Sequence, residues 1–332
     1  MEYFSREDIS DFLSFHISES NRFADRFIES IDKWNFTGKG KLKLRDIKAL
    51  ERCEIDLRGL IGRDSYGGVL RASDLRVRQK LGELFLEGMP KTFKMNNWHG
   101  VDNFFQITIV SDFMIVSAYE PEIDIEKFRR KVTTVLSGIK SLCAIGVVEF
   151  EMLKNPKHLE ASLGIMVHVH LLAWSFVEFE ESDLESKIKG FSSSHTVKAV
   201  KVQKHENGIQ GIMKMASYYT KFPVSGKLAI HKKKSKSWTK KSLRKVGLRN
   251  DDRIRIVEIL SLIPMTSLIF AVRGGNSAKK EILKQLHNWH REHSDTPIRS
   301  FPQNETFKIW ELARKHNGSQ AFKRPKIWIR RT

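Results

Sequence analysis

Alternating apolar and polar positions single out one short segment in the middle of the chain. Residues 164–174 read G-I-M-V-H-V-H-L-L-A-W, a run rich in β-branched and apolar side chains with the length of a strand. Side chains alternate across a strand, so Met166, His168, His170 and Leu172 share one face. Two imidazoles on one face can bind a single divalent ion. The alternative interpretation is a pair of hydrogen-bonded histidines on a half-buried strand.

The periodicity of apolar residues around this segment predicts an alternation of strands and helices. We expect strands at 104–110, 143–151 and 195–202 and helices at 123–139, 182–190 and 208–222. Pro223 ends the last helix, because proline cannot continue a helical hydrogen-bond ladder. Elements interleaved in this way favour an α+β fold, in which a central antiparallel sheet is flanked by helices, over a doubly wound parallel sheet.

The first 95 residues show mainly helical spacing. Ser5 followed by Asp8 is a candidate cap for the first helix, and a further helical pattern covers 75–86. The stretch 87–100 contains glycine, proline and asparagine and marks a boundary. Residues 1–95 therefore form a helical N-terminal region, which is a candidate DNA-binding unit.

The rest of the chain divides into a central core, 96–225, and a basic C-terminal region, 226–332, that we expect to be mainly helical. The C-terminal region begins with a run dense in lysine around one tryptophan. We expect phosphate contacts and base stacking from this run, and the alternative is a solvated surface segment. The candidate DNA-binding residues are Lys232, Lys233, Lys234, Lys236, Trp238, Lys240, Lys241 and Arg244.

The charge balance points to a polyanionic partner. The 332 residues include 58 Lys and Arg against 39 Asp and Glu, a net charge of +19. Such an excess favours nucleic acid ahead of a membrane surface. The most apolar run, 259–272, is too short to cross a bilayer and contains Pro264. We therefore expect a cytoplasmic protein with no membrane partner. The two cysteines form no C-x-x-C pair, which argues against a zinc finger.

A carboxylate on the preceding predicted strand can complete a metal site. If the strand at 143–151 pairs with the histidine strand, Glu149 can join His168 and His170 as a third ligand. Two imidazoles and a carboxylate with open positions suit Mg²⁺ or Mn²⁺ acting as a Lewis acid on a phosphodiester. Glu151 lies on the same strand face and is an alternative ligand.

The predicted helix at 208–222 carries the motif Y-Y-T-K. Tyr218 and Lys221 are three residues apart and share a helical face, and Tyr219 is a fallback nucleophile. A phenol is a poor nucleophile unaided, and a lysine and a metal-polarised phosphate would both assist its attack on phosphorus. The alternative interpretation, without catalysis, is a surface helix with an amphipathic tyrosine.

The order of these motifs resembles the HUH endonuclease superfamily, and within it the rolling-circle replication initiator (Rep) proteins of plasmids and phages. The resemblance covers residues 100–225. The segment F-F-Q-I-T at 104–108 is similar to the family's first motif, with Gln106 in place of a threonine, and G-V-V-E at 146–149 is similar to the strand that supplies a metal-binding glutamate. The H-V-H and Y-x-x-K motifs complete the set, although Phe222 stands where many relatives have a tyrosine.

The resemblance implies an RRM-like palm and a metal-dependent transesterification of single-stranded origin DNA. Tyr218 would form a 5′-phosphotyrosine link and leave a 3′-OH primer for host replication proteins, a polymerase and a helicase, in a prokaryotic cell. Lys221 would orient the phosphate, and Glu149, His168 and His170 would hold Mg²⁺ or Mn²⁺. We find no Walker A pattern, so we expect no attached helicase.

Three alternatives stay open at this point. A conjugative relaxase or an HUH transposase would keep the chemistry and change the biology. A catalytically silent nucleic-acid-binding protein would show salt-sensitive binding without metal dependence. A phosphodiesterase that uses water would cleave DNA without forming a protein adduct. Two other histidine groups, His158 and the H-N-W-H-R-E-H run at 287–293, are interpreted as solvated side chains.

Overall fold

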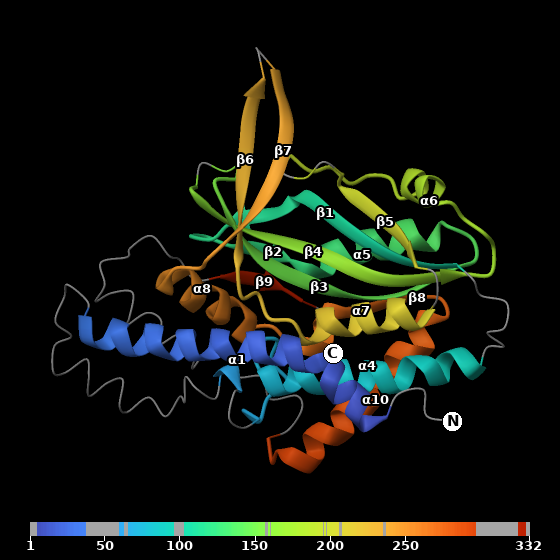
Figure 1. Cartoon of the computed structure of the whole chain (residues 1–332), viewed down its shortest axis with the longest axis horizontal. Helices are drawn as coiled ribbons and strands as arrows, with labels where there is room; N and C mark the ends of the chain where they lie inside the picture. The colour runs from blue at the N-terminus through green and yellow to red at the C-terminus, as the bar shows by residue number, and fades with distance from the viewer. Residues whose placement is uncertain are drawn as a thin grey trace.

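A computed structural model describes the chain with short gaps. The described residues are 5–37, 60–62, 66–95, 103–156, 159, 161–194, 196, 198–205, 208–234, 237–296 and 325–329. The fold is α+β, with a central, mostly antiparallel sheet flanked by helices, as the sequence predicts (Figure 1).

The central sheet has seven strands in the order β5-β1-β4-β3-β6-β7, and β8 also pairs with β3. All of its pairings are antiparallel except the short parallel contact between β3 and β6. A second, two-stranded parallel sheet joins β2 to β9. The strands are β1 Asn103–Ser117, β2 Glu122–Asp124, β3 Leu142–Lys154, β4 Leu163–Ser175, β5 Val200–His205, β6 Gly226–Lys234, β7 Ser237–Val246, β8 Ile269–Val272 and β9 Lys326–Trp328.

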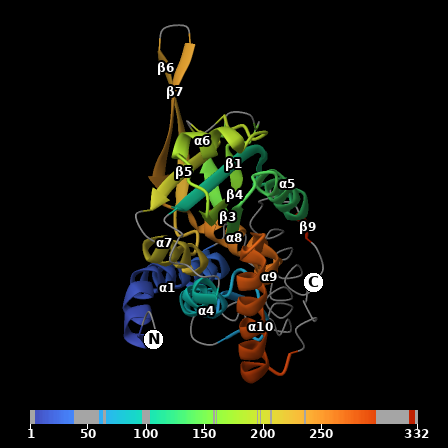
Figure 2. The same cartoon turned by 90° about the vertical axis from the view of Figure 1, so that its right-hand side faces the viewer.

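Helices cover both faces of the sheet. Helix α7 lies directly against the face that carries the two histidines, and α1 and α4 form a further layer on α7, whereas α5 packs on the opposite side of the sheet (Figure 1, Figure 2). The helices are α1 Arg6–Thr37, α4 Leu75–Met95, α5 Ile125–Ser137, α6 Glu181–Lys187, α7 Gly208–Thr220, α8 Asn250–Ser261, α9 Met265–Leu268 and α10 Gly275–His293.

Local sequence signals explain where several helices begin. The Ser5 hydroxyl accepts a hydrogen bond from the Asp8 amide at 3.0 Å, and the Asp8 carboxylate accepts one from the Ser5 amide at 2.8 Å, which confirms the predicted cap of α1. The Asp124 carboxylate caps α5 by accepting from the Lys127 amide at 2.7 Å. Within α5, Ile125 lies on the buried face together with other apolar residues at helical spacing, Phe128, Val132 and Leu136.

Some predicted boundaries are wrong. Helix α4 continues through Pro90 to Met95, past the helix end expected at 86. Buried neighbours such as Met89 hold this part of α4 in place, and tertiary packing overrides the local signal. The strand predicted at 195–202 corresponds to β5, which lies at 200–205 because its pairing with β1 begins at Val200.

The described parts of both terminal regions pack against the core. Helices α1 and α4 of the N-terminal region lie against α7 of the core, and Phe23 of α1 contacts Phe222 with ring centroids 4.7 Å apart. The C-terminal region is only partly helical, since β6 and β7 form its beginning and β8 pairs with β3 inside the core. No helix among the described residues has both the length and the apolar character needed to cross a membrane.

Candidate active site

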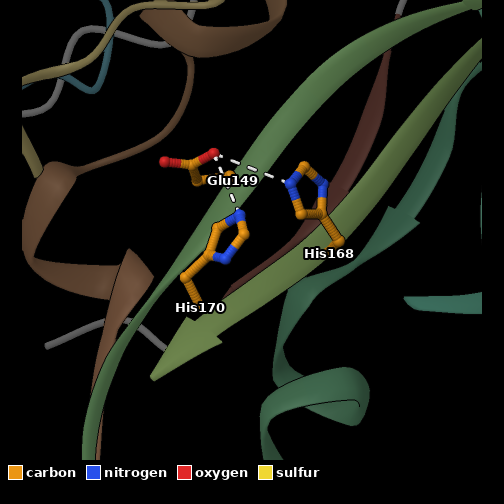
Figure 3. A group of neighbouring side chains, drawn as sticks. All are labelled: Glu149, His168 and His170. Atoms are coloured by element: carbon orange, nitrogen blue, oxygen red, sulfur yellow. Dashed lines mark ion pairs between the residues drawn. The ribbon is translucent and has the colours of Figure 1, made fainter. Parts of the chain in front are cut away.

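Three side chains on β3 and β4 converge at one point (Figure 3). The Glu149 Oε2 atom lies 3.6 Å from Nε2 of His168 and 3.6 Å from Nε2 of His170. The three ligand atoms all lie within 4.8 Å of one another, so the group can hold a metal ion. Cis ligands of an octahedral Mg²⁺ are about 3 Å apart, given metal–oxygen distances near 2.1 Å. The two Glu149–histidine distances of 3.6 Å would have to shorten by about 0.6 Å to match this spacing.

Strand register creates this arrangement. Glu149 on β3 stands directly opposite His168 on β4, and His170 follows two residues later on the same face. On the other side of β4, Thr108 of β1 stands opposite His170. The Thr108 Oγ1 atom lies 3.0 Å from His170 Nδ1. When Nδ1 carries the proton it donates to this hydroxyl, which leaves the Nε2 lone pair facing Glu149.

Burial sets the charge of all three groups in the metal-free protein. It lowers the pKa of His168 to about 3 and lowers the pKa of His170 well below its usual value, and the charge of Lys221 adds to both effects. Burial raises the pKa of Glu149 to about 7, against the opposing charges of Lys221 and Arg78. Both imidazoles are therefore neutral and ready to act as ligands at neutral pH.

The second oxygen of Glu149 also fits a cation. Its Oε1 atom is buried and has no hydrogen-bond partner within the described part of the chain. A buried carboxylate oxygen normally finds a donor, and an unmatched one is a favourable position for a metal or its bound water. The donor set, two neutral imidazoles and a carboxylate, suits Mg²⁺, Mn²⁺ or another divalent ion.

Tyr218 lies against this group. Its ring stacks on the His170 ring, with centroids 3.8 Å apart and an angle of 13° between the planes. Burial raises the pKa of Tyr218, while a hydrogen bond with Gln106 and the charge of Lys221 lower it. Gln106, the central residue of the F-F-Q-I-T segment on β1, therefore faces the tyrosine. The phenol is half-buried and next to the candidate metal ligands.

Tyr219 lies in a different environment. It is 1% exposed, and its ring contacts Phe85 of α4 with centroids 4.8 Å apart. Its hydroxyl is buried with no hydrogen-bond partner among the described residues, and burial raises the pKa of the phenol strongly. Adjacent residues on a helix point about 100° apart, which explains why one tyrosine faces the site and the other faces the core.

Two glycines allow α7 to lie close enough to the sheet for the Tyr218 ring to stack on His170. A Cβ on Gly211 would come within 2.8 Å of the Leu172 side chain on β4, and a Cβ on Gly82 would come within 2.2 Å of the Thr220 hydroxyl. The first glycine brings α7 down onto the sheet, and the second brings α4 onto α7. The helix is thereby fixed between two layers, with Tyr218 against the histidine face.

Lys221 follows directly after α7 and faces the same carboxylate. Its Nζ atom lies 3.9 Å from Glu149 Oε2 and 5.7 Å from the Tyr218 ring centroid. Glu149 is the main reason that the pKa of Lys221 is raised, so the ammonium stays charged at neutral pH. The structure thus brings together all five residues that the sequence assigns to metal binding and catalysis.

Arg78 of α4 is a site neighbour that sequence reasoning missed. This side chain is 4% exposed, and its Nη1 donates to the Lys221 carbonyl at 2.8 Å. Its guanidinium carbon also lies 5.3 Å from the centroid of the Phe222 ring, which is within the range of a cation–π interaction. Arg78, Glu149 and Lys221 line one small cavity of about 20 Å³. No sequence signal links Arg78 to residues 143 positions away.

The other glutamate and histidine residues considered as ligands are not part of this site. Glu151, the alternative ligand, instead pairs with Lys227 at 3.6 Å. The expectation of a solvated side chain is wrong for His290, which is buried, lies 2.5 Å from the Tyr66 hydroxyl through Nδ1 and contacts the Thr296 carbonyl through Nε2. His158 lies outside the described residues.

The candidate DNA-binding residues belong to one β-hairpin. Strands β6 and β7 pair along their length and project from the body of the molecule (Figure 1). Seven of the predicted residues are on these strands, namely Lys232, Lys233, Lys234, Trp238, Lys240, Lys241 and Arg244. Lys236 lies outside the described residues.

Comparisons of this chain with protein-family models, with curated proteins and with solved structures found no match.

Proposed function

We propose that this protein is a metal-dependent DNA nicking and joining enzyme of the HUH type, which initiates rolling-circle replication of a plasmid or phage. The observation that carries the proposal is the Tyr218 ring stacked at 3.8 Å on His170, itself part of the Glu149–His168–His170 group. Structural histidines on a strand need neither a carboxylate between them nor a neighbouring tyrosine and lysine. The net charge of +19 supports a nucleic-acid substrate.

The proposed reaction is a transesterification. A divalent ion held by Glu149, His168 and His170 would supply Lewis-acid polarisation of the scissile phosphate. The Tyr218 oxygen forms a bond to phosphorus as its proton leaves, and the bond from phosphorus to the 3′ oxygen breaks. The leaving oxygen takes up a proton and becomes a free 3′-OH, while the 5′-phosphate stays on the tyrosine. Lys221 stabilises negative charge on the phosphoryl oxygens.

The products explain the proposed biological role. The free 3′-OH primes a host polymerase, and a host helicase separates the strands. One phosphodiester is exchanged for another, so rejoining needs no nucleotide cofactor. Since Tyr219 is buried in the core, the two adjacent tyrosines supply one nucleophile, and a second subunit or a water must complete the cycle.

An oligonucleotide assay tests this proposal. The protein is incubated with Mn²⁺ and a mixture of single-stranded DNAs labelled at either end, and the products are separated on a denaturing gel. The 3′-labelled fragment should migrate with the protein, and the 5′-labelled fragment should be released. Tyr218→Phe and EDTA should each abolish the adduct. Tyr219→Phe is the matched control and should retain it.

Each failure of this assay has a separate meaning. Cleavage without an adduct would replace the proposal by a phosphodiesterase that uses water. Salt-sensitive DNA binding with no metal-dependent cleavage would indicate a non-catalytic binding protein. An adduct on DNA from a transposon end or a transfer origin would keep the chemistry and assign the protein to the transposases or relaxases.

A further inference from the structure

The β6–β7 hairpin is anchored only at its base. Strand β6 pairs with β3 only at Lys227 and Leu228, opposite Leu153 and Lys154. Ala229 lies at the edge of a small apolar cluster that also includes Val110, Ile115, Leu153 and Met166, with Leu243 of β7 packed against it. Beyond these positions the two strands pair only with each other among the described residues (Figure 1, Figure 2).

The charges along the hairpin are all of one sign. Residues 226–246 contain nine Lys and Arg residues and no Asp or Glu. At the base, Lys227 is paired with Glu151 of the body. Further out, the register places Lys232 opposite Lys240 and His231 opposite Lys241. Like charges directly opposite on an antiparallel pair destabilise it, and an isolated two-stranded ribbon is marginally stable in water. A polyanion would remove this repulsion.

The dimensions of the hairpin fit one polyanion. Two paired strands are about 4.8 Å apart, and the major groove of B-DNA is about 12 Å wide and admits a two-stranded ribbon. Residues 231–234 extend roughly 13 Å beyond the anchored base, at about 3.3 Å per residue, which exceeds the groove depth of about 8.5 Å. Proteins that hold single strands use a groove with several aromatic platforms, whereas this hairpin contains one aromatic residue, Trp238.

We infer that the β6–β7 hairpin is a duplex-DNA-binding arm that enters the major groove, distinct from the site that would bind the single strand to be cut. This inference deepens the proposed function, from which it takes its partner. The arm would hold the protein on the double-stranded part of its target while the strand for cleavage lies at Tyr218. Its contacts are mainly with phosphates, so they contribute affinity and a strong dependence on salt.

A shortened hairpin tests the inference. Residues 231–241 are replaced by Asn-Gly, which joins Ile230 to Ser242, two residues already opposite in the register, through a two-residue turn. Binding to a labelled 20-base-pair duplex and to one of its single strands is measured by fluorescence anisotropy in EDTA over a range of NaCl concentrations. Six lysines are lost. We expect about a hundredfold weaker duplex binding at 50 mM NaCl and a log–log salt slope smaller by about 4.

A second variant keeps the hairpin length. Lys232→Ala with Lys240→Ala removes one cross-strand pair and should weaken duplex binding about tenfold, with the slope smaller by about 2. Lys232→Arg with Lys240→Arg should retain the affinity. If the shortened protein fails to fold, as judged by thermal melting, this pair of variants decides the question.

The outcomes separate the arm from the cleavage site. Unchanged duplex affinity in the shortened or double-alanine protein would overturn the inference. An equal loss of affinity for the duplex and the single strand would also overturn it. So would unchanged duplex affinity together with weaker binding to phosphatidylserine vesicles, which is measured in parallel. Mn²⁺-dependent adduct formation on single-stranded oligonucleotides is measured in parallel for wild type and variants, as a separate test of the chemistry. If none of the proteins forms an adduct, the proposed function fails, while the duplex comparison still tests the arm.

Discussion

Replacing Glu149 by glutamine distinguishes two roles of this carboxylate, that of a metal ligand and that of a structural partner of neighbouring cations. Burial raises the pKa of Glu149 from its ordinary 4.5 to about 7. Between these pH values the folded, metal-free protein binds a proton that the unfolded chain has released, so its stability falls as the pH rises through this window. At about 1.4 kcal/mol per pH unit, the buried carboxylate opposes folding at pH 8 by about 3 kcal/mol. Glutamine has nearly the same shape and no such proton.

Urea unfolding in EDTA, followed by tryptophan fluorescence, measures this difference. Glu149→Gln should become more stable relative to wild type by about 3 kcal/mol between pH 4.5 and pH 8. Mn²⁺ at a hundred times its dissociation constant should stabilise wild type by about 2.7 kcal/mol and leave the variant unchanged. Glu151→Gln is the matched control, because Glu151 pairs with Lys227 outside the metal group. It should keep the full response to Mn²⁺.

Two results would refute this reasoning. One is a Glu149→Gln protein that is less stable than wild type in EDTA at every pH, which would make the carboxylate a structural partner of its neighbouring cations. The other is a variant that Mn²⁺ stabilises as strongly as wild type, which would place the ion elsewhere.

Three further predictions concern neighbouring groups. Thr108→Val removes the partner of His170 Nδ1 and should lower Mn²⁺ affinity about 10- to 100-fold in calorimetry, while Thr108→Ser should retain it; equal affinities would contradict this role. Tyr219→Phe removes a buried hydroxyl without a described partner and should leave stability unchanged or raise it by up to about 1 kcal/mol in urea unfolding; a loss of several kcal/mol would reveal a missed hydrogen bond. Mn²⁺ affinity should fall about tenfold per pH unit below pH 7 and level off above pH 8, because Glu149 alone must lose a proton. A slope of two or more near pH 6 would show that His168 or His170 is protonated in the metal-free site.

The central strands could be predicted because their patterns are local. Alternation placed His168 and His170 on one face of a strand, and the structure confirms both the strand and the shared face. The metal group with Glu149 depended on a pairing between two strands, a condition that the sequence left open and the structure meets. The approach of Tyr218 to His170 came only from the resemblance, since no local pattern fixes where a helix docks on a sheet.

Other features depend on contacts that are distant in sequence. Arg78 reaches Lys221 from a helix that local signals assign to another region. Helix α4 continues past Pro90 because its packing against the core outweighs the local effect of proline. The hairpin at 226–246 was hidden because a run of lysines masks the alternation that identifies a strand.

Mapping the covalent adduct tests the central claim most directly. The protein is allowed to react with a single-stranded oligonucleotide and Mn²⁺, the complex is digested with nuclease and protease, and the modified peptide is sequenced by mass spectrometry. Our account predicts one nucleotide-bearing residue, Tyr218, with the nucleotide linked through its 5′-phosphate, and no such peptide from proteins lacking His168 or His170. An adduct on Tyr219 or on a residue remote from the metal group, or one that forms equally well without either histidine, would contradict it.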